Sequence, residues 1–168
     1  MAVYTTITQT EAQQLFKPLG EIKTFEGIRE GVENTNYLVH LDDSKKYILT
    51  IFEKRTNEKD LPYFNKLMKL FHSNGVSCPL SVNIKNEDLF RINEKPCCIY
   101  SFVEGRPLLE INKEKLNSLG SSIAHLHKSG INAKVFRKNM MLLPSWKNIT
   151  ESFSRNSTNI HIDEYNYI

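Results

Sequence analysis

The sequence has few cysteines and no apolar run of membrane-spanning length. Its three cysteines, Cys78, Cys97 and Cys98, are an odd set, and adjacent residues of a strand point to opposite faces. This disfavours a disulfide framework and predicts buried, reduced thiols in a cytoplasmic protein. Residues 1–14 have no basic segment followed by an apolar one, so we expect no signal peptide and no membrane association.

An excess of charge of one sign is also missing. Lysine and arginine number 22 against 19 aspartates and glutamates, for a net charge of +3, so no nucleic-acid partner is expected. His125 and His127 are two residues apart and lie on different faces of a helix, and no acidic or cysteine partner follows them; we predict no metal site there. The 40% of apolar residues suffices for the core of one domain or of two small lobes.

Hydrophobic periodicity and capping signals predict the helices and strands of the first half of the chain. Thr8 and Glu11 have the spacing of a capping box, which opens a short helix ending near residues 17–18. Strands are expected at 22–28, 37–41 and 47–52, the last two forming a hairpin. Asp60 is a plausible N-cap for a helix that ends at Ser73-Asn74-Gly75. That helix has an apolar stripe with helical spacing: Phe64, Leu67, Met68 and Phe71.

The second half begins with extended segments and ends in helices. In residues 80–84 apolar side chains alternate with other residues, and after a turn residues 89–92 run back in an extended conformation. Residues 97–103 form an apolar strand typical of the centre of a sheet. The residues 104–107, Glu-Gly-Arg-Pro, break this strand, and an amphipathic helix is expected at about 113–128. Residues 131–168 show no strong period. Three strands, a helix and two more strands, followed by helices, are typical of the small lobe of a kinase-like fold, an α+β structure.

One turn has the composition of a phosphate-binding loop. Gly31, Asn34 and Thr35 are small or polar residues at the tip of the turn before residue 37, where backbone N–H groups can approach a phosphate closely. Most hairpins of this composition bind nothing, so the turn alone leaves both interpretations open.

Longer stretches carry a more specific signal. They are MAVYTTI, FEGIREGVENTNYLVH, YILTIFEKR, DLPYFNKLMKLFHSNGVSCP, CCIYSFVEGRPL, LGSSIAHLH and LPSW. With these stretches, residues 1 to about 146 resemble the bacterial homoserine kinases of the aminoglycoside-phosphotransferase (protein-kinase-like) fold. The resemblance implies a five-stranded antiparallel sheet with one helix at 1–104, a hinge at 101–107, and the first helices of an incomplete large lobe at 108–168.

The resemblance also implies ligands and binding residues. ATP and Mg²⁺ are the expected cofactors and homoserine the expected substrate, in threonine biosynthesis. Gly31 to Asn36, with Val32, Asn34 and Thr35 among them, would cover the ATP phosphates, and Ser101 and Val103 would bind adenine through a carbonyl and an N–H. Leu38, Ile48 and Ile99 would enclose the base, with plain core packing as the alternative for each.

Two departures from the wider superfamily concern the phosphate site. Thr50 stands where a lysine is usual, and no glutamate lies near the middle of the helix at 60–74, so no Lys–Glu pair is expected. Lys54 would share a strand face with Thr50 if the strand continued. It would then reach a phosphate; otherwise it is a solvated lysine at a strand end.

A third departure concerns catalysis. Phosphoryl transfer uses an H-x-D-x-x-x-x-N segment and a later aspartate. His161-Ile162-Asp163 is an H-x-D near the end of the given sequence, and Ile168 stands where the asparagine belongs. We interpret this match as chance and expect neither catalytic nor metal-binding residues, so whether this chain is an enzyme stays open. Three hypotheses remain: half of a split kinase with a complementary C-terminal fragment, a non-catalytic nucleotide-binding module, or a degraded kinase.

Overall fold

The computed structural model describes residues 3–107, 109–139 and 142–156. His161-Ile162-Asp163, on which the catalytic expectation depends, lies outside these residues. The chain divides into two compact units, residues 1–136 and residues 137–168, and the assignment of two lobes that meet near residues 101–107 stays a prediction.

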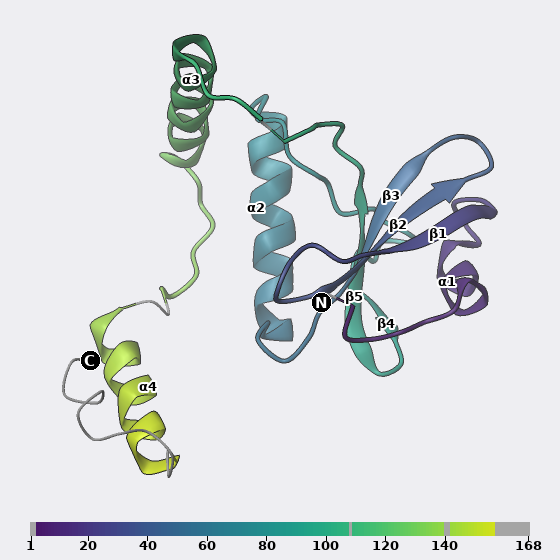
Figure 1. Cartoon of the computed structure of the whole chain (residues 1–168), viewed down its shortest axis with the longest axis horizontal. Helices are drawn as coiled ribbons and strands as arrows, with labels where there is room; N and C mark the ends of the chain where they lie inside the picture. The colour runs from purple at the N-terminus through teal and green to yellow at the C-terminus, as the bar shows by residue number, and fades with distance from the viewer. Residues whose placement is uncertain (1–2, 108, 140–141, 157–168) are drawn as a thin grey trace. The chain divides into compact units, whose positions relative to one another are not determined.

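The first unit is built on an antiparallel sheet of five strands in the order β1-β2-β3-β5-β4 (Figure 1). The strands are β1 (Ile22–Ile28), β2 (Thr35–Leu41), β3 (Lys46–Ile51), β4 (Phe90–Ile92) and β5 (Lys95–Ser101). The predicted five-stranded sheet is therefore confirmed. Residues 80–84 lie beside β5 without forming a strand of their own, since Val82 N–H donates to the Ile99 carbonyl at 2.8 Å and Ser81 makes a single bridge to Tyr100.

Helix α1 (Gln9–Phe16) begins at the predicted capping box. The Thr8 hydroxyl accepts from the Glu11 N–H at 3.2 Å, and the Glu11 carboxylate accepts from the Thr8 N–H at 2.7 Å. The helix buries Ala12 and Phe16 in a core with the side chains of β2 and β3 that alternate toward it, such as Val39 and Leu49. We call this side of the sheet the α1 face.

Helix α2 (Leu61–Ser73) packs on the other side, which we call the α2 face. Leu61 is buried there against Phe52 and Cys98. Asp60 is the N-cap as predicted, but its side chain makes no capping hydrogen bond, because a 3₁₀ turn (Glu58–Asp60) precedes the helix and Asn57 caps that turn instead. The predicted stop is confirmed: the helix ends at Ser73, and Gly75 has a φ of +81°.

Helix α3 (Lys113–Gly130) contacts α2 within the same unit. Nε2 of His125 lies 2.9 Å from the Asn74 carbonyl oxygen, at the end of α2. On the same helix Leu116, Leu119 and Ile123 are 54%, 51% and 45% exposed, so α3 leaves an apolar stripe uncovered by the described residues.

The second unit contains helix α4 (Leu143–Asn156). The sequence of residues 131–168 has no strong hydrophobic period from which this helix could be located. None of the helices among residues 3–107, 109–139 and 142–156 combines the length and the apolar character that a membrane span requires.

Candidate nucleotide-binding site

The predicted loop and hinge lie at opposite ends of one strand ladder. The loop leads into β2 at Thr35, which pairs with Ile51 of β3, and Ile51 pairs with Cys97 of β5. At the other end of the ladder Tyr47 pairs with Ser101. Cys97 and Ser101 are four positions apart in β5, which corresponds to about 13 Å at the usual rise per residue. An elongated ligand can therefore span the distance between the loop and the hinge.

A row of half-buried apolar side chains crosses the α2 face near the hinge. Leu38 pairs with Ile48, and Ile48 pairs with Tyr100, so the three side chains lie side by side on adjacent strands. Ile99 is not part of this row. It is fully buried in the core on the α1 face, because successive residues of a strand alternate between faces. The expectation that Ile99 encloses the base is wrong, and Tyr100 holds the position beside Ile48.

The next row of the same face is polar. Asn36 pairs with Thr50, and Thr50 pairs with Cys98. The Thr50 hydroxyl donates to Oδ1 of Asn36 at 2.8 Å, so the position where a lysine is usual carries a satisfied hydroxyl. From α2, the buried Asn65 reaches this region, and its Nδ2 lies 3.6 Å from the sulfur of Cys98. An uncharged amide thus occupies the side of α2 on which a glutamate is usual.

The loop itself is an irregular turn. Gly31 has a φ of +111°, a conformation that side chains with a Cβ rarely adopt. Val32 is 76% exposed at the tip. Oδ1 of Asn34 accepts from the Glu53 N–H at 3.2 Å, and the Thr35 hydroxyl is fully buried and also hydrogen-bonded. The side chains of Asn34 and Thr35 therefore fix the turn, which leaves its backbone N–H groups as the candidate phosphate contacts.

Lys54 lies after β3 rather than on it. The strand ends at Ile51, and Lys54 is an exposed residue of the turn that follows, so it does not continue the strand face of Thr50. Lys54 borders a cavity of about 440 Å³ beside the loop. The cavity is lined by Tyr4, Val32, Glu33, Glu53, Lys54, Arg55 and Lys95. The structure brings Lys54 near Val32 but not near Ser101 or Val103, which lie at the far end of the ladder.

The hinge residues border a second cavity, of about 550 Å³. Ser101 and Val103 line it together with the end of α2 and the residues after it, including Val76 and Cys78. The Ser101 N–H donates to the Leu80 carbonyl at 2.8 Å, and the Ser101 hydroxyl accepts from the Leu80 N–H at 2.9 Å. These bonds use the amide and hydroxyl of Ser101 and leave its carbonyl as the candidate acceptor.

An exposed ion pair supports the hinge. Nζ of Lys46 lies 2.6 Å from Oε1 of Glu104 and 5.2 Å from the centre of the Phe102 ring. The Glu104 side chain is 75% exposed, so the pair contributes little to stability. It does connect the start of β3 to the chain that leaves β5.

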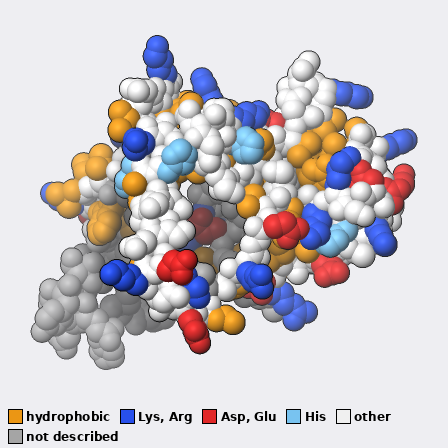
Figure 2. All heavy atoms as spheres, turned by 90° about the horizontal axis from the view of Figure 1, so that it is seen from above, with side chains coloured by type: hydrophobic (Ala, Val, Ile, Leu, Met, Phe, Trp, Pro, Cys, Tyr) orange, Lys and Arg blue, Asp and Glu red, His pale blue; other side chains and the backbone are white. Residues whose placement is uncertain are grey.

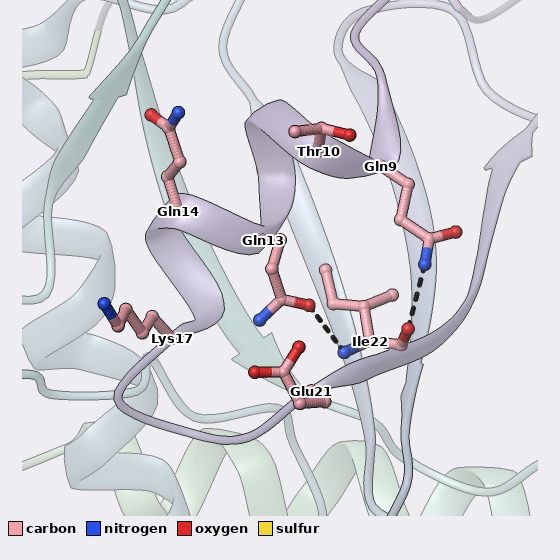
Figure 3. A pocket seen from close by; sticks show the side chains of 7 residues that line it. All are labelled: Gln9, Thr10, Gln13, Gln14, Lys17, Glu21 and Ile22. Atoms are coloured by element: carbon pink, nitrogen blue, oxygen red, sulfur yellow. Dashed lines mark hydrogen bonds between the residues drawn. The ribbon is translucent and has the colours of Figure 1, made fainter.

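A third hollow, between α1 and β1, is of a different kind (Figure 3). Nε2 of Gln9 donates to the Ile22 carbonyl at 2.9 Å, and Oε1 of Gln13 accepts from the Ile22 N–H at 2.7 Å. Its amide side chains hold the first residue of β1 in place. It lies on the α1 face, away from the loop-to-hinge ladder, and we do not assign it a ligand.

The described residues offer no metal ligand set. Among them no group of three or more histidine, cysteine, aspartate or glutamate side chains is placed to hold a metal ion. On the side shown in Figure 2, basic and acidic side chains are interspersed rather than gathered by sign.

Known proteins similar to this chain support the fold described above. The phosphotransferase enzyme family matches residues 24–147. Homoserine kinases from Parvibaculum lavamentivorans and Brucella ovis are 37% and 36% identical over 155 and 151 residues. These matches cover 90% and 88% of this chain but 48% and 46% of the relatives. The chain therefore spans about half the length of the curated relatives it matches.

Two solved structures share the fold at 15% sequence identity. Spectinomycin phosphotransferase, in complex with ADP and spectinomycin, superposes with a TM-score of 0.67 over 94% of this chain and 50% of that one. Amicoumacin kinase, in complex with AMP-PNP, Ca²⁺ and Ami, superposes with a TM-score of 0.65 over 92% of this chain and 55% of that one.

Proposed function

This chain belongs to the phosphotransferase enzyme family, and on that premise we propose that it is the nucleotide-binding portion of an ATP-dependent homoserine kinase. The observation that carries the proposal is the placement of the loop and the hinge at opposite ends of one strand ladder, with an apolar row between them. The choice of homoserine as the acceptor rests on the homoserine kinases that are 36–37% identical to the chain.

In this proposal the adenine lies on the α2 face near the hinge. Leu38 and Ile48 contact the ring, and its polar edge binds the carbonyl of Ser101 and the N–H of Val103. Adenine has an apolar face and a polar edge, and binding sites for such ligands combine apolar walls with a few placed polar groups. Both side chains are half-buried by the described residues, so a planar ligand can still cover them.

The triphosphate extends from there toward the loop. Backbone N–H groups of residues 31–35 are the proposed donors, because a glycine without a Cβ allows close approach of the backbone. Lys54 is the proposed cation at this end, and it reaches the phosphates from the turn after β3 rather than from the strand. The loop thereby orients the γ-phosphoryl group for attack by the homoserine hydroxyl.

Acid–base chemistry and metal binding are not assigned to the described residues. A carboxylate must accept the proton of the attacking hydroxyl, and a metal ion normally neutralises charge on the phosphates. The described residues contain no cluster suited to that ion. We therefore expect the chain to bind nucleotide and to depend on a complementary C-terminal half for turnover.

An ADP-release assay with homoserine tests this function. The chain is measured alone and after co-purification with the C-terminal half of the Parvibaculum lavamentivorans homoserine kinase. We expect no turnover alone and homoserine-dependent ADP release from the complex. A complex that forms and binds ATP but releases ADP only with other alcohols would overturn homoserine as the substrate.

The same assay separates the remaining alternatives. Robust turnover by the chain alone that is lost in Asp163→Ala would show that His161-Ile162-Asp163 is catalytic after all. ATP binding without turnover in any complex would identify a non-catalytic nucleotide-binding module.

A further inference from the structure

A polar cluster lies at the loop end of the sheet. Its centre is the carboxylate of Glu53, whose side chain is 11% exposed. Oε1 accepts from the hydroxyls of Thr5 at 2.6 Å and Thr35 at 2.8 Å, and Oε2 accepts from the ammonium of Lys95. The cluster joins segments that are up to 90 residues apart in sequence, since Lys95 also donates to the Thr5 hydroxyl at 2.6 Å.

The hydrogen bonds of Thr35 are complete. A hydroxyl has one proton to donate and two lone pairs with which to accept. The proton goes to Glu53, and the backbone N–H groups of Tyr4 and Thr5 donate to the oxygen at 2.9 and 3.0 Å. Glu53 thus sets the orientation of the hydroxyl in which both N–H groups are satisfied.

Residues 4–7, which we call the N-terminal strap, hold the loop from a second side. The Tyr4 hydroxyl donates to the Val32 carbonyl at the loop tip at 3.0 Å. The Tyr37 hydroxyl donates to the Thr5 carbonyl at 2.9 Å and accepts from the Ile7 N–H at 3.2 Å. The strap is therefore anchored on β2 and on Glu53, and it contacts the loop where the loop is most exposed.

The loop needs such support because it has no regular secondary structure between residues 29 and 34. Fixing each backbone residue of an irregular turn costs about 1–2 kcal/mol of conformational entropy. Glu53 offsets part of this cost at the C-terminal end of the loop, where its carboxylate accepts from Thr35 and its N–H donates to Asn34. A ligand that binds the loop then meets a turn that is already ordered.

We propose that Glu53 is a positioning residue, which holds the turn at residues 31–35 in one conformation through Thr35, Asn34 and the strap. That the turn binds phosphate rests on the proposed function, whereas the ordering of the turn does not. The carboxylate is hydrogen-bonded to Thr5, Thr35 and Lys95, so its proposed role is exerted through the loop.

Amide hydrogen exchange of the nucleotide-free chain tests the proposal. In Glu53→Gln the ammonium of Lys95 loses its charge partner. We expect exchange of the Thr35 and Asn36 amides, where the loop joins the ladder with Ile51 and Ile28, to accelerate about tenfold, as for the loss of a charge-assisted hydrogen bond. Exchange of the β5 amides at 97–101 should stay unchanged. The matched control is Glu87→Gln, at an exposed turn, which should change neither segment.

A milder variant keeps the test decisive if Glu53→Gln does not fold. Tyr4→Phe removes only the hydroxyl bonded to Val32, from a residue that is 56% exposed, and should accelerate exchange of the same two amides by a smaller factor. Unchanged loop exchange in both variants, or equal acceleration across the whole sheet, would overturn the positioning role.

ATP titration of the same samples separates this inference from the proposed function. Weaker ATP binding by Glu53→Gln than by Glu87→Gln supports both. Faster loop exchange in Glu53→Gln than in the wild type, together with a wild-type chain that binds no ATP, supports the positioning role and overturns nucleotide binding.

Discussion

The hydroxyl of Tyr100 donates a hydrogen bond to Oδ1 of Asn65, 2.9 Å away. This bond joins the strand that leads into the hinge to the helix on the α2 face. Asn65 is 2% exposed, and a buried amide without partners is costly, so the pair is a specific link between two elements. Tyr100 is also in the apolar row at which we place adenine, so this link positions a wall of the candidate site.

Replacement of Asn65 should destabilise the chain. In Asn65→Leu the Tyr100 hydroxyl is left without its acceptor, and we expect the free energy of unfolding to fall by about 1–3 kcal/mol. Urea denaturation measures the effect. Tyr100→Phe completes a double-mutant cycle in which the double variant should lose clearly less than the sum of the single variants. Additive losses would show that the two side chains do not act as a pair.

The three cysteines should differ in reactivity. Cys97 and Cys98 are fully buried, and burial raises the pKa of the Cys97 thiol to about 12 and also raises that of Cys98. Cys78 is half-buried. With Ellman's reagent at mildly alkaline pH we expect one thiol to react in the native chain and two more only on unfolding. Cys78→Ser should remove the first phase alone, and a first phase that persists in this variant would contradict the assignment.

Stability should depend on Glu53 at acid pH. Burial opposes ionisation of this carboxyl, but hydrogen bonds from Lys95, Thr5 and Thr35 outweigh it and hold its pKa below the ordinary 4.5. A lowered pKa stabilises the fold above the ordinary value, and this contribution is lost as the pH falls through the folded-state pKa. The free energy of unfolding should therefore fall more between about pH 5 and 3 in the wild type than in Glu53→Gln. Equal slopes would show that Glu53 ionises as freely in the folded chain as in the unfolded one.

Nucleotide affinity should be low in the isolated chain. Under the proposed function this chain supplies only part of the nucleotide site, and its described residues offer no metal ligand set. We therefore expect calorimetry with Mg·ATP to give a dissociation constant in the high micromolar range or weaker. Such binding is worth less than about 6–8 kcal/mol. A sub-micromolar constant would mean that the phosphate and metal sites of this chain are more complete than we propose.

Local patterns in the sequence predicted most of the fold. The capping box at Thr8, the stripe from Phe64 to Phe71 and the alternation in β2 each depend on neighbours within a few residues, which is the range over which periodicity is informative. The edge of the sheet was harder to predict. Residues 80–84 alternate like a strand, but only one bridge to β5 forms, and whether such a segment becomes a strand is decided by its tertiary partners.

The candidate site was predicted less completely, for physical reasons. The face on which Ile99 lies depends on strand register, and a shift of one residue exchanges the two faces. Lys54 would share a strand face with Thr50 only if the strand continued, and β3 ends at Ile51, which the local sequence did not reveal. The cluster of Glu53, Thr5 and Lys95 joins residues distant in sequence, and no short motif encodes contacts of that range.

The most direct test of the nucleotide site is an NMR titration of the ¹⁵N-labelled chain with ATP. Our account predicts that the largest amide shift changes fall at residues 31–36 and 101–103, the two ends of the β3–β5 ladder, with smaller changes around Ile48. Changes confined to the hollow between α1 and β1 at residues 9–22, or none at millimolar ATP, would contradict it.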